Sequence, residues 1–278
     1  MGKRIHLAAA LLAVLVGLVG LSLSTVGDAV QNNGGKVEVT YIANEGFLLR
    51  SGGSTVLIDA LHRGEIEMYA KPSERTLHDL ESAASEFADV GLILVSHYHR
   101  DHFKAEAVAN HMAANPGARL ISSPQVVEEV RRAASNEINS DSAYPMVPGR
   151  AKFRLAGVDL ELFRLPHGTG RYAKIQNLGQ IFVVDGIKFL HIGDAEVIAE
   201  NFAVHKLAKD RIDYAFIPYW FLTDAEGRRI VSEIIRPRHV IAMHIPPAEM
   251  EVEKEKIRAA FPGAIIFTTR DESRTLPQ

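Results

Sequence analysis

One segment of this 278-residue chain concentrates side chains that bind metal ions. Residues 97–102 are His-Tyr-His-Arg-Asp-His, so three imidazoles and one carboxylate lie within six positions. They follow Ser96 and an apolar run at residues 91–95, which is typical of a strand buried on both faces. Histidine and carboxylate are the zinc ligands where thiolate is absent, and the chain has no Cys. The pattern predicts a metal site at a strand end.

Other residues of the same chemical types follow other predicted strands. They are His167, Asp194 and His244, each placed where an apolar strand ends. Asp59 likewise closes the strand expected at residues 55–59. Because ligands of open sheets bind at strand ends, one shared cleft could collect all of these side chains.

The elements that must position these residues alternate in a recognisable order. In the first half, strands are expected at 37–41, 46–50, 55–59, 91–95 and 119–122, and helices at 74–87, 104–114 and 124–134. In the second half, strands are expected at 152–155, 158–164, 180–185, 187–191, 214–217, 239–243 and 264–267, and helices at 195–207, 225–235 and 247–261. Two mixed sheets with helices outside would satisfy this order.

Composition excludes several classes of protein. Lys+Arg is 31 and Asp+Glu is 34, a net charge of −3, and no block of like charge stands out. We therefore expect a small-molecule substrate and no nucleic-acid partner. The hydrophobic content of 47% is ordinary for a globular domain. The absence of Cys excludes a disulfide scaffold and a cysteine nucleophile.

The first 29 residues have the pattern of an export signal. Lys3 and Arg4 precede an apolar run at residues 7–23 that only Ser22 interrupts. Cleavage after Ala29 would leave residues 30–278 as a single domain. The alternative is an uncleaved membrane anchor formed by residues 5–23. Either reading predicts a periplasmic or extracellular location.

The chain resembles the metallo-β-lactamase-fold superfamily, and within it the lactonase and phosphodiesterase-like hydrolases. Its signature is an early Asp, then H-x-H-x-D-H, then His, Asp and His, which here are Asp59, His97, His99, Asp101, His102, His167, Asp194 and His244. The resemblance implies a four-layer αββα sandwich of two mixed sheets flanked by helices.

The resemblance also implies two metal positions. His97, His99 and His167 would hold the first ion. Asp101, His102 and His244 would hold the second ion. Asp194 would bridge the two, and Asp59 would hydrogen-bond inside the site and orient ligands.

This arrangement implies hydrolysis. Two ions about 3.5–4 Å apart hold a hydroxide that attacks an ester-like bond, such as a lactone, a carboxylic ester or a phosphodiester. We take Asp101 and Asp59 as the catalytic carboxylates, with Asp101 able to accept the nucleophile's proton. The alternatives are a mononuclear iron oxygenase of the same fold acting on a sulfur substrate, and a non-catalytic metal-binding protein.

Departures from the family narrow the expectation. Without Cys and with Asp194, antibiotic hydrolysis is disfavoured. Flavodiiron oxygen reductases carry Glu where this chain has His99, and nuclease members add domains that are not apparent here. We expect two divalent ions. The ligand types favour zinc, and manganese or iron would suit the same set.

A further group of residues has weaker claims to substrate binding. They are His62, Arg171, Tyr172, Tyr219 and Trp220. His62 follows Asp59 closely, and its alternative is a surface loop. Arg171 could pair with a phosphate or carboxylate. Residues 62–78 could form a lid, whereas His191, inside a predicted strand, is expected to be a packed core residue.

Overall fold

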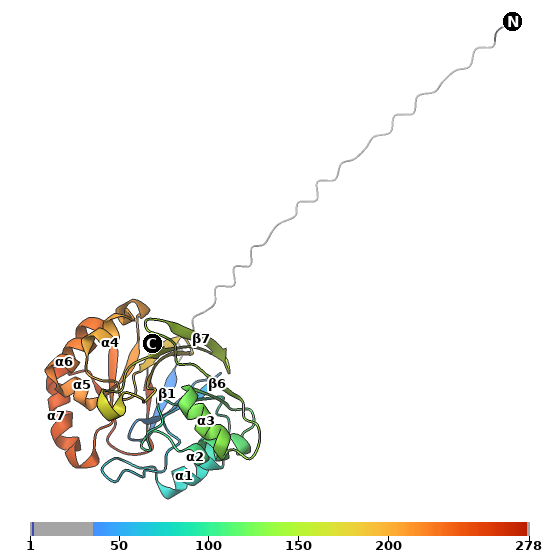
Figure 1. Cartoon of the computed structure of the whole chain (residues 1–278), viewed down its shortest axis with the longest axis horizontal. Helices are drawn as coiled ribbons and strands as arrows, with labels where there is room; N and C mark the ends of the chain where they lie inside the picture. The colour runs from blue at the N-terminus through green and yellow to red at the C-terminus, as the bar shows by residue number, and fades with distance from the viewer. Residues whose placement is uncertain (1, 3–35, 277–278) are drawn as a thin grey trace. The chain divides into compact units, whose positions relative to one another are not determined.

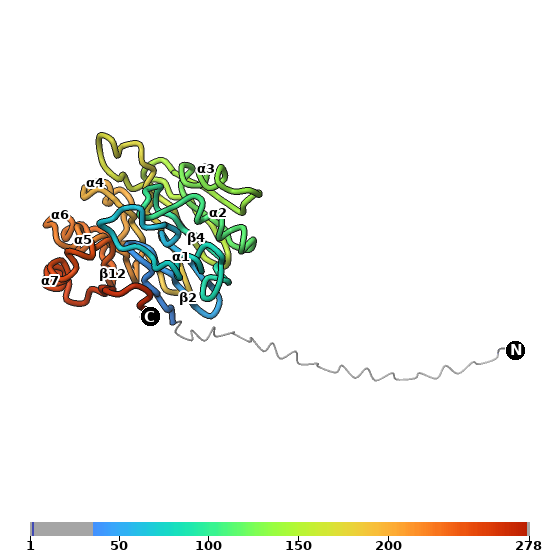
Figure 2. Tube along the Cα trace, turned by 90° about the horizontal axis from the view of Figure 1, so that it is seen from below, coloured from blue at the N-terminus to red at the C-terminus, as the bar shows by residue number. Residues whose placement is uncertain are grey.

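Three hydrophobic cores arrange the chain in four layers (Figures 1 and 2). The computed structural model describes residue 2 and residues 36–276. One core lies between two sheets, one between the first sheet and its helices, and one between the second sheet and its helices. The predicted αββα sandwich is confirmed. The export signal or anchor predicted at residues 1–29 lies outside the described residues, apart from Gly2.

The first sheet has seven strands: neighbours among the first four in the sheet order are antiparallel, and the last four run parallel. They are β1 (Val37–Ala43), β2 (Gly46–Arg50), β3 (Thr55–Ile58), β4 (Leu92–Leu94), β5 (Arg119–Ser122), β6 (Ser140–Ser142) and β14 (Glu272–Leu276). Their order is β14-β1-β2-β3-β4-β5-β6. The carboxyl ends of β3 and β4 therefore meet at one edge.

The second sheet repeats this plan with seven strands of its own. They are β7 (Arg150–Leu155), β8 (Val158–Arg164), β9 (Leu178–Val184), β10 (Ile187–His191), β11 (Tyr214–Pro218), β12 (His239–Met243) and β13 (Ile265–Ile266). Their order is β13-β12-β11-β10-β9-β8-β7, and β10 to β13 run parallel. The carboxyl ends of β10 and β12 consequently present their following loops together.

Helices cover the outer face of each sheet (Figure 1). The first sheet is covered by α1 (Glu74–Glu81), α2 (Ala105–Ala114) and α3 (Pro124–Ala133), and the second by α4 (Ala199–Ala203), α5 (Tyr219–Thr223), α6 (Ala225–Arg229) and α7 (Met250–Ala260). Local sequence explains their starts. Ser123 caps α3 by accepting from the Val126 amide, and Pro124 occupies the first turn, where no amide donor is needed. No helix among the described residues is long and apolar enough to cross a membrane.

Several predicted elements were wrong in length. The helix expected at 195–207 is only α4, because the Glu196 amide donates to Pro166 O instead of entering a helical turn. The helix expected at 74–87 ends at Glu81, and a separate 3-10 turn follows at Ser85–Phe87. β6 and β14 were not predicted, since both are edge strands with mostly polar residues.

Candidate metal centre

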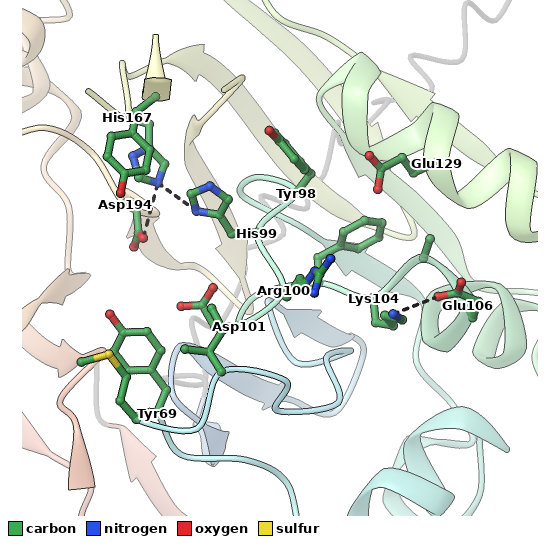
Figure 3. Close-up of a pocket in the computed structure, with 15 residues that line it drawn as sticks. Tyr69, Tyr98, His99, Arg100, Asp101, Lys104, Glu106, Glu129, His167 and Asp194 are labelled. Carbon is green, nitrogen blue, oxygen red and sulfur yellow. Dashed lines mark hydrogen bonds and ion pairs between the residues drawn. The ribbon is translucent and has the colours of Figure 1, made fainter. Parts of the chain in front are cut away.

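Imidazoles from two loops converge at the carboxyl edge of the sheets. His97 and His99 follow β4, and His167 follows β8. His167 Nε2 lies 3.2 Å from His99 Nδ1, and the rings of His97 and His167 have centroids 4.8 Å apart. The three side chains predicted for the first ion are therefore together, and Figure 3 shows His99 and His167 directed toward each other beside Asp194.

Asp194 faces two separate groups of imidazoles with its two oxygens. Its Oδ2 lies 3.6 Å from His167 Nε2 and 3.9 Å from His97 Nε2. Its Oδ1 lies 3.5 Å from His102 Nε2 and 3.6 Å from His244 Nε2. The carboxylate stands between the two predicted positions, as a bridging ligand must.

The second group is richer in carboxylate than the first. Asp101 Oδ2 lies 3.3 Å from His244 Nε2 and 3.8 Å from His102 Nε2. His244 follows β12 with a φ of 62°, a left-handed backbone that non-glycine residues seldom adopt outside special sites. The three side chains predicted for the second ion thus meet at one place.

Glu45 also belongs to this second group, and the sequence pattern missed it. It lies in the turn between β1 and β2, is fully buried, and places Oε1 2.7 Å from His244 Nε2 and 3.1 Å from His102 Nε2. A carboxylate in a tight turn between two apolar strands was the available signal. The sequence pattern did not single out Glu45, because no histidine lies near it in the sequence.

Asp59 is buried next to the metal ligands and supports them through hydrogen bonds. Its carboxylate accepts from the amide and hydroxyl of Ser96 and lies 2.9 Å from His102 Nδ1, where it accepts the ring proton. Asp59 is 1% exposed and does not line the cavity, so it is placed to orient His102 and not to touch substrate. His191 is fully buried, as expected for a core residue, and its Nδ1 accepts from the Gly193 amide.

Asn177 fastens the loops that carry His167 and Asp194. Its amide group donates to Leu165 O and Ile192 O, and its Oδ1 accepts from the Asp194 amide. Gly193, with a φ of 53°, makes room for it, since an added Cβ would lie 2.2 Å from Asn177 Oδ1. Asn177 was not singled out from the sequence, because a lone Asn at a strand start carries no distinctive pattern.

The protonation states suit metal binding. Burial, with the neighbouring imidazole of His167, lowers the pKa of His99 to about 4, and burial lowers that of His244 to about 3. Burial also holds the pKa of His97 well below its ordinary value. These rings are neutral at pH 7, and neutral imidazole is the form that coordinates a metal ion.

His102 behaves differently in the protein without metal. Burial acts to lower its pKa, but the carboxylates of Asp194 and Asp59 outweigh it and raise this pKa well above the ordinary value. Burial acts to raise the pKa of Asp194, yet the charge on His102 outweighs burial and holds this pKa well below its ordinary value. A cluster of carboxylates therefore attracts positive charge at the position where a metal ion is expected.

The donor atoms fit two bound ions. Ligand atoms held about 2.0–2.2 Å from one ion in a tetrahedron lie roughly 3.3–3.6 Å apart. The separations here run from 2.7 Å, between His244 Nε2 and Glu45 Oε1, to 3.9 Å, between His97 Nε2 and Asp194 Oδ2, a range that includes this value. Several of these atoms are buried and have no hydrogen-bond partner among residues 36–276: Nε2 of His97, His102 and His244, and Oδ1 of Asp194. Buried polar atoms are rarely left unpaired, so a cation is the partner they lack.

A cavity of about 710 Å³ opens over these ligands (Figure 3). His99, Asp101, His167 and Asp194 line it together with Tyr69, which lies near Asp101. Tyr69 comes from the 62–78 segment, which therefore borders the cavity, as its suggested role as a lid requires.

The residues predicted for substrate binding are placed unevenly. Tyr172 lines the cavity and stacks on His167, with ring centroids 5.1 Å apart. Arg171 is exposed and lies over the Tyr172 ring instead of lining the cavity. Trp220 packs edge-on against His244 at 5.0 Å, and Tyr219 packs against Trp220, so both lie behind a ligand.

The structure agrees with neither prediction for His62, which was expected to bind substrate or to lie in a surface loop. It is fully buried, so it neither lies on the surface nor lines the cavity. Its Nδ1 accepts from the Gly64 amide, and burial lowers its pKa to about 4. Its physical setting is that of a packed neutral imidazole.

This chain is similar to known proteins in sequence and in fold. The sequence profile described as a Beta-lactamase superfamily domain matches residues 38–244. A UPF0173 metal-dependent hydrolase of Pyrococcus furiosus is 25% identical over 250 residues, covering 86% of this chain and 100% of the relative. The metallo hydrolase Igni18 of Ignicoccus hospitalis has a TM-score of 0.59 at 18% identity, covering 87% of this chain and 98% of its own. A possible metal-dependent hydrolase of Veillonella parvula has a TM-score of 0.60 at 16% identity, covering 86% and 99%.

Proposed function

This chain belongs to the beta-lactamase superfamily and is a metal-dependent hydrolase, and on that premise we propose that it uses two metal ions to cleave a neutral ester or lactone. One observation carries the dinuclear part of the proposal. The two oxygens of Asp194 face two different groups of imidazoles, at 3.6 and 3.9 Å on one side and 3.5 and 3.6 Å on the other. A single ion would need only one of these groups.

The ions and the chain's own residues have separate tasks. When bound, two divalent ions supply hydroxide at neutral pH and polarise the scissile bond. Asp101 lines the cavity beside His244 and is placed to accept the proton of the attacking water. In the protein without metal, burial raises the pKa of Asp101.

Tyr69 is placed to donate a hydrogen bond to the substrate. Its ring lies edge-on to His244, with centroids 4.3 Å apart, and it lines the same cavity as Asp101. Burial, with the nearby charges of Asp101 and Asp194, raises the pKa of Tyr69 to about 12. The phenol therefore keeps its proton and can donate to the oxygen on which charge develops, or to the leaving group.

The charges on the cavity wall favour a neutral substrate over an anionic one. Arg100 and Lys104 line the cavity, but they lie 3.6 Å and 2.6 Å from the carboxylate of Glu65. Glu106 and Glu129 line the same wall. The wall therefore adds little attraction for an anionic substrate such as a phosphodiester beyond that of the bound ions, which favours an ester or lactone.

The proposal also covers the identity of the metal and the cellular location of the protein. Three imidazoles and one shared carboxylate favour zinc in the first position. The basic start and apolar run of residues 1–29 support export, by a cleaved signal or an anchor, with residues 30–278 as the catalytic domain.

The proposal is tested by activity of the full chain purified without chelators. We expect hydrolysis of an aryl ester or lactone that chelation abolishes and zinc restores, and at most weak hydrolysis of a bis-aryl phosphodiester. Asp194→Ala should abolish this activity. Preferred cleavage of the phosphodiester would contradict the neutral-substrate proposal. One iron per chain with oxygen uptake on a persulfide would instead support the oxygenase.

A further inference from the structure

We propose that Glu45 is a ligand of the second metal ion and makes that position a site for a hard ion such as Mn²⁺, while the three-imidazole position takes Zn²⁺. The inference rests on the proposed dinuclear site. It adds a protein ligand that lies outside the histidine-rich motif, and it makes the two positions chemically different.

The distances place Glu45 among the donors of the second position. Its Oε1 lies 2.7 Å from His244 Nε2 and 3.1 Å from His102 Nε2. The same two nitrogen atoms face Asp194 Oδ1 at 3.6 and 3.5 Å and Asp101 Oδ2 at 3.3 and 3.8 Å. Three carboxylates therefore converge on the same pair of imidazole nitrogens.

Burial leaves the Glu45 carboxylate in need of a cation. The residue is fully buried, and neither of its oxygens has a hydrogen-bond partner within residues 36–276. The Nε2 atoms of His102 and His244 that face it are likewise unpartnered in this part of the chain. A buried carboxylate is unfavourable unless it is paired or coordinates a metal ion, and these neighbours are themselves metal-ligand atoms.

The backbone holds Glu45 at this place. The preceding residue, Asn44, has a φ of 51°, and its carbonyl accepts from the His244 amide. The Asn44 side chain donates to Asp101 O. After Glu45, Gly46 brings the turn against the end of β3, where an added Cβ would lie 2.8 Å from Ala60 Cα. The turn is thus fastened to the loops that supply Asp101 and His244.

The two positions then differ in charge and hardness. The first offers three imidazoles and one oxygen of Asp194, a set that suits zinc. The second offers two imidazoles with Asp101, Glu45 and the other oxygen of Asp194. Carboxylate oxygens suit Mn²⁺, which accepts more ligands than tetrahedral zinc.

The experiment measures metal binding and not turnover. Full-length protein is freed of metal, given one equivalent of Zn²⁺, and titrated with Mn²⁺ while free Mn²⁺ is followed by electron paramagnetic resonance. We expect wild type to retain the zinc and bind one Mn²⁺. Glu45→Gln, nearly isosteric but uncharged, should keep the zinc and weaken Mn²⁺ binding at least tenfold. Glu38→Gln, the same change at an exposed position of β1, should bind Mn²⁺ as wild type does.

The outcomes separate this inference from the function on which it rests. Mn²⁺ binding by Glu45→Gln equal to that of wild type would overturn the role of Glu45 and leave the dinuclear hydrolase intact. Failure of wild type to bind a second ion of any kind would instead overturn the dinuclear proposal. If Glu45→Gln does not fold, Glu45→Asp decides. It keeps the charge but shortens the reach, so its Mn²⁺ affinity should fall, and an unchanged affinity would contradict the role.

Discussion

Asp59 Oδ2 accepts the Nδ1 proton of His102 at 2.9 Å, and this contact decides which nitrogen of His102 faces the metal centre. When the ring is neutral and its proton is on Nδ1, Nε2, which points to Asp194 Oδ1 3.5 Å away, is the nitrogen that would bind an ion. Asp59 in turn is fixed by the amide and hydroxyl of Ser96. Asp59 thus orients His102 from a buried position, although Asp59 itself does not line the cavity.

Replacing this carboxylate should weaken the second metal position. Asp59 has a φ of 45°, which Asn tolerates, so Asp59→Asn preserves the backbone while removing the charge. We expect the affinity for the second ion to fall about 10–100-fold, as for other partners of metal-bound histidine. Competition with a chromophoric chelator measures it, and Asp89→Asn at an exposed site is the control. Unchanged affinity would mean that Asp59 does not orient His102.

Tyr69→Phe should slow catalysis without removing metal. The phenol lines the cavity beside Asp101 and is not a metal ligand. Its removal should therefore cost only transition-state stabilisation, a loss of about 10²-fold in kcat. Tyr98→Phe, on another part of the cavity wall, is the matched variant. Equal kcat for wild type and Tyr69→Phe would remove the donor role.

Gly193→Ala should disturb the loop that carries Asp194. The new Cβ would meet Asn177 Oδ1 at 2.2 Å and Ser96 Cβ at 2.8 Å, and the backbone φ of 53° disfavours any side chain. We expect a loss of about 1–3 kcal/mol in the free energy of unfolding, together with weaker metal binding. Gly263→Ala, with no atom within 4 Å of the added Cβ, should change neither. A fully stable Gly193→Ala protein with wild-type metal affinity would contradict the packing argument.

His62 should make the metal-free fold sensitive to acid. Burial, with the charge on His102, lowers its pKa from 6.5 to about 4, so the unfolded chain takes up this proton first as the pH falls. The stabilisation of the folded state is therefore complete above about pH 6.5 and is lost as the pH falls toward 4. Between pH 7 and pH 5, the contribution of His62 to the free energy of unfolding should fall by about 2 kcal/mol.

Denaturant unfolding of the metal-free protein at these two pH values measures that loss. His62→Asn should reduce the difference in unfolding free energy between pH 7 and pH 5, because the amide does not titrate. The same change at the exposed His78 should leave the difference as in wild type. An equal pH dependence for His62→Asn and wild type would show that His62 is not the group responsible.

The strand-end residues were predictable because their signal is local. A wholly apolar strand followed by a dense histidine cluster fixes where His97, His99 and His102 lie, and the parallel strands then bring Asp194 and His244 to the same edge. The family resemblance supplied the division into two positions, and the distances around Asp194 agree with it.

What escaped the sequence depends on long-range contacts. Glu45 meets His244 only because the turn after β1 packs under the loop after β12, a contact between residues 199 positions apart. Asn177 acts through carbonyls of two different loops, which no spacing encodes. Edge strand β14 pairs with β1 through the backbone, so its polar side chains gave no strand pattern.

The number of metal ions that one chain binds tests the central claim most directly. Full-length, metal-free protein titrated with Zn²⁺ against a chromophoric chelator, with and without Mn²⁺, gives this number at equilibrium. We predict two ions per chain for wild type and weakened binding of both ions in Asp194→Asn, because one carboxylate faces both groups. Saturation at one ion per chain, or Asp194→Asn binding two ions as tightly as wild type, would contradict a shared dinuclear centre.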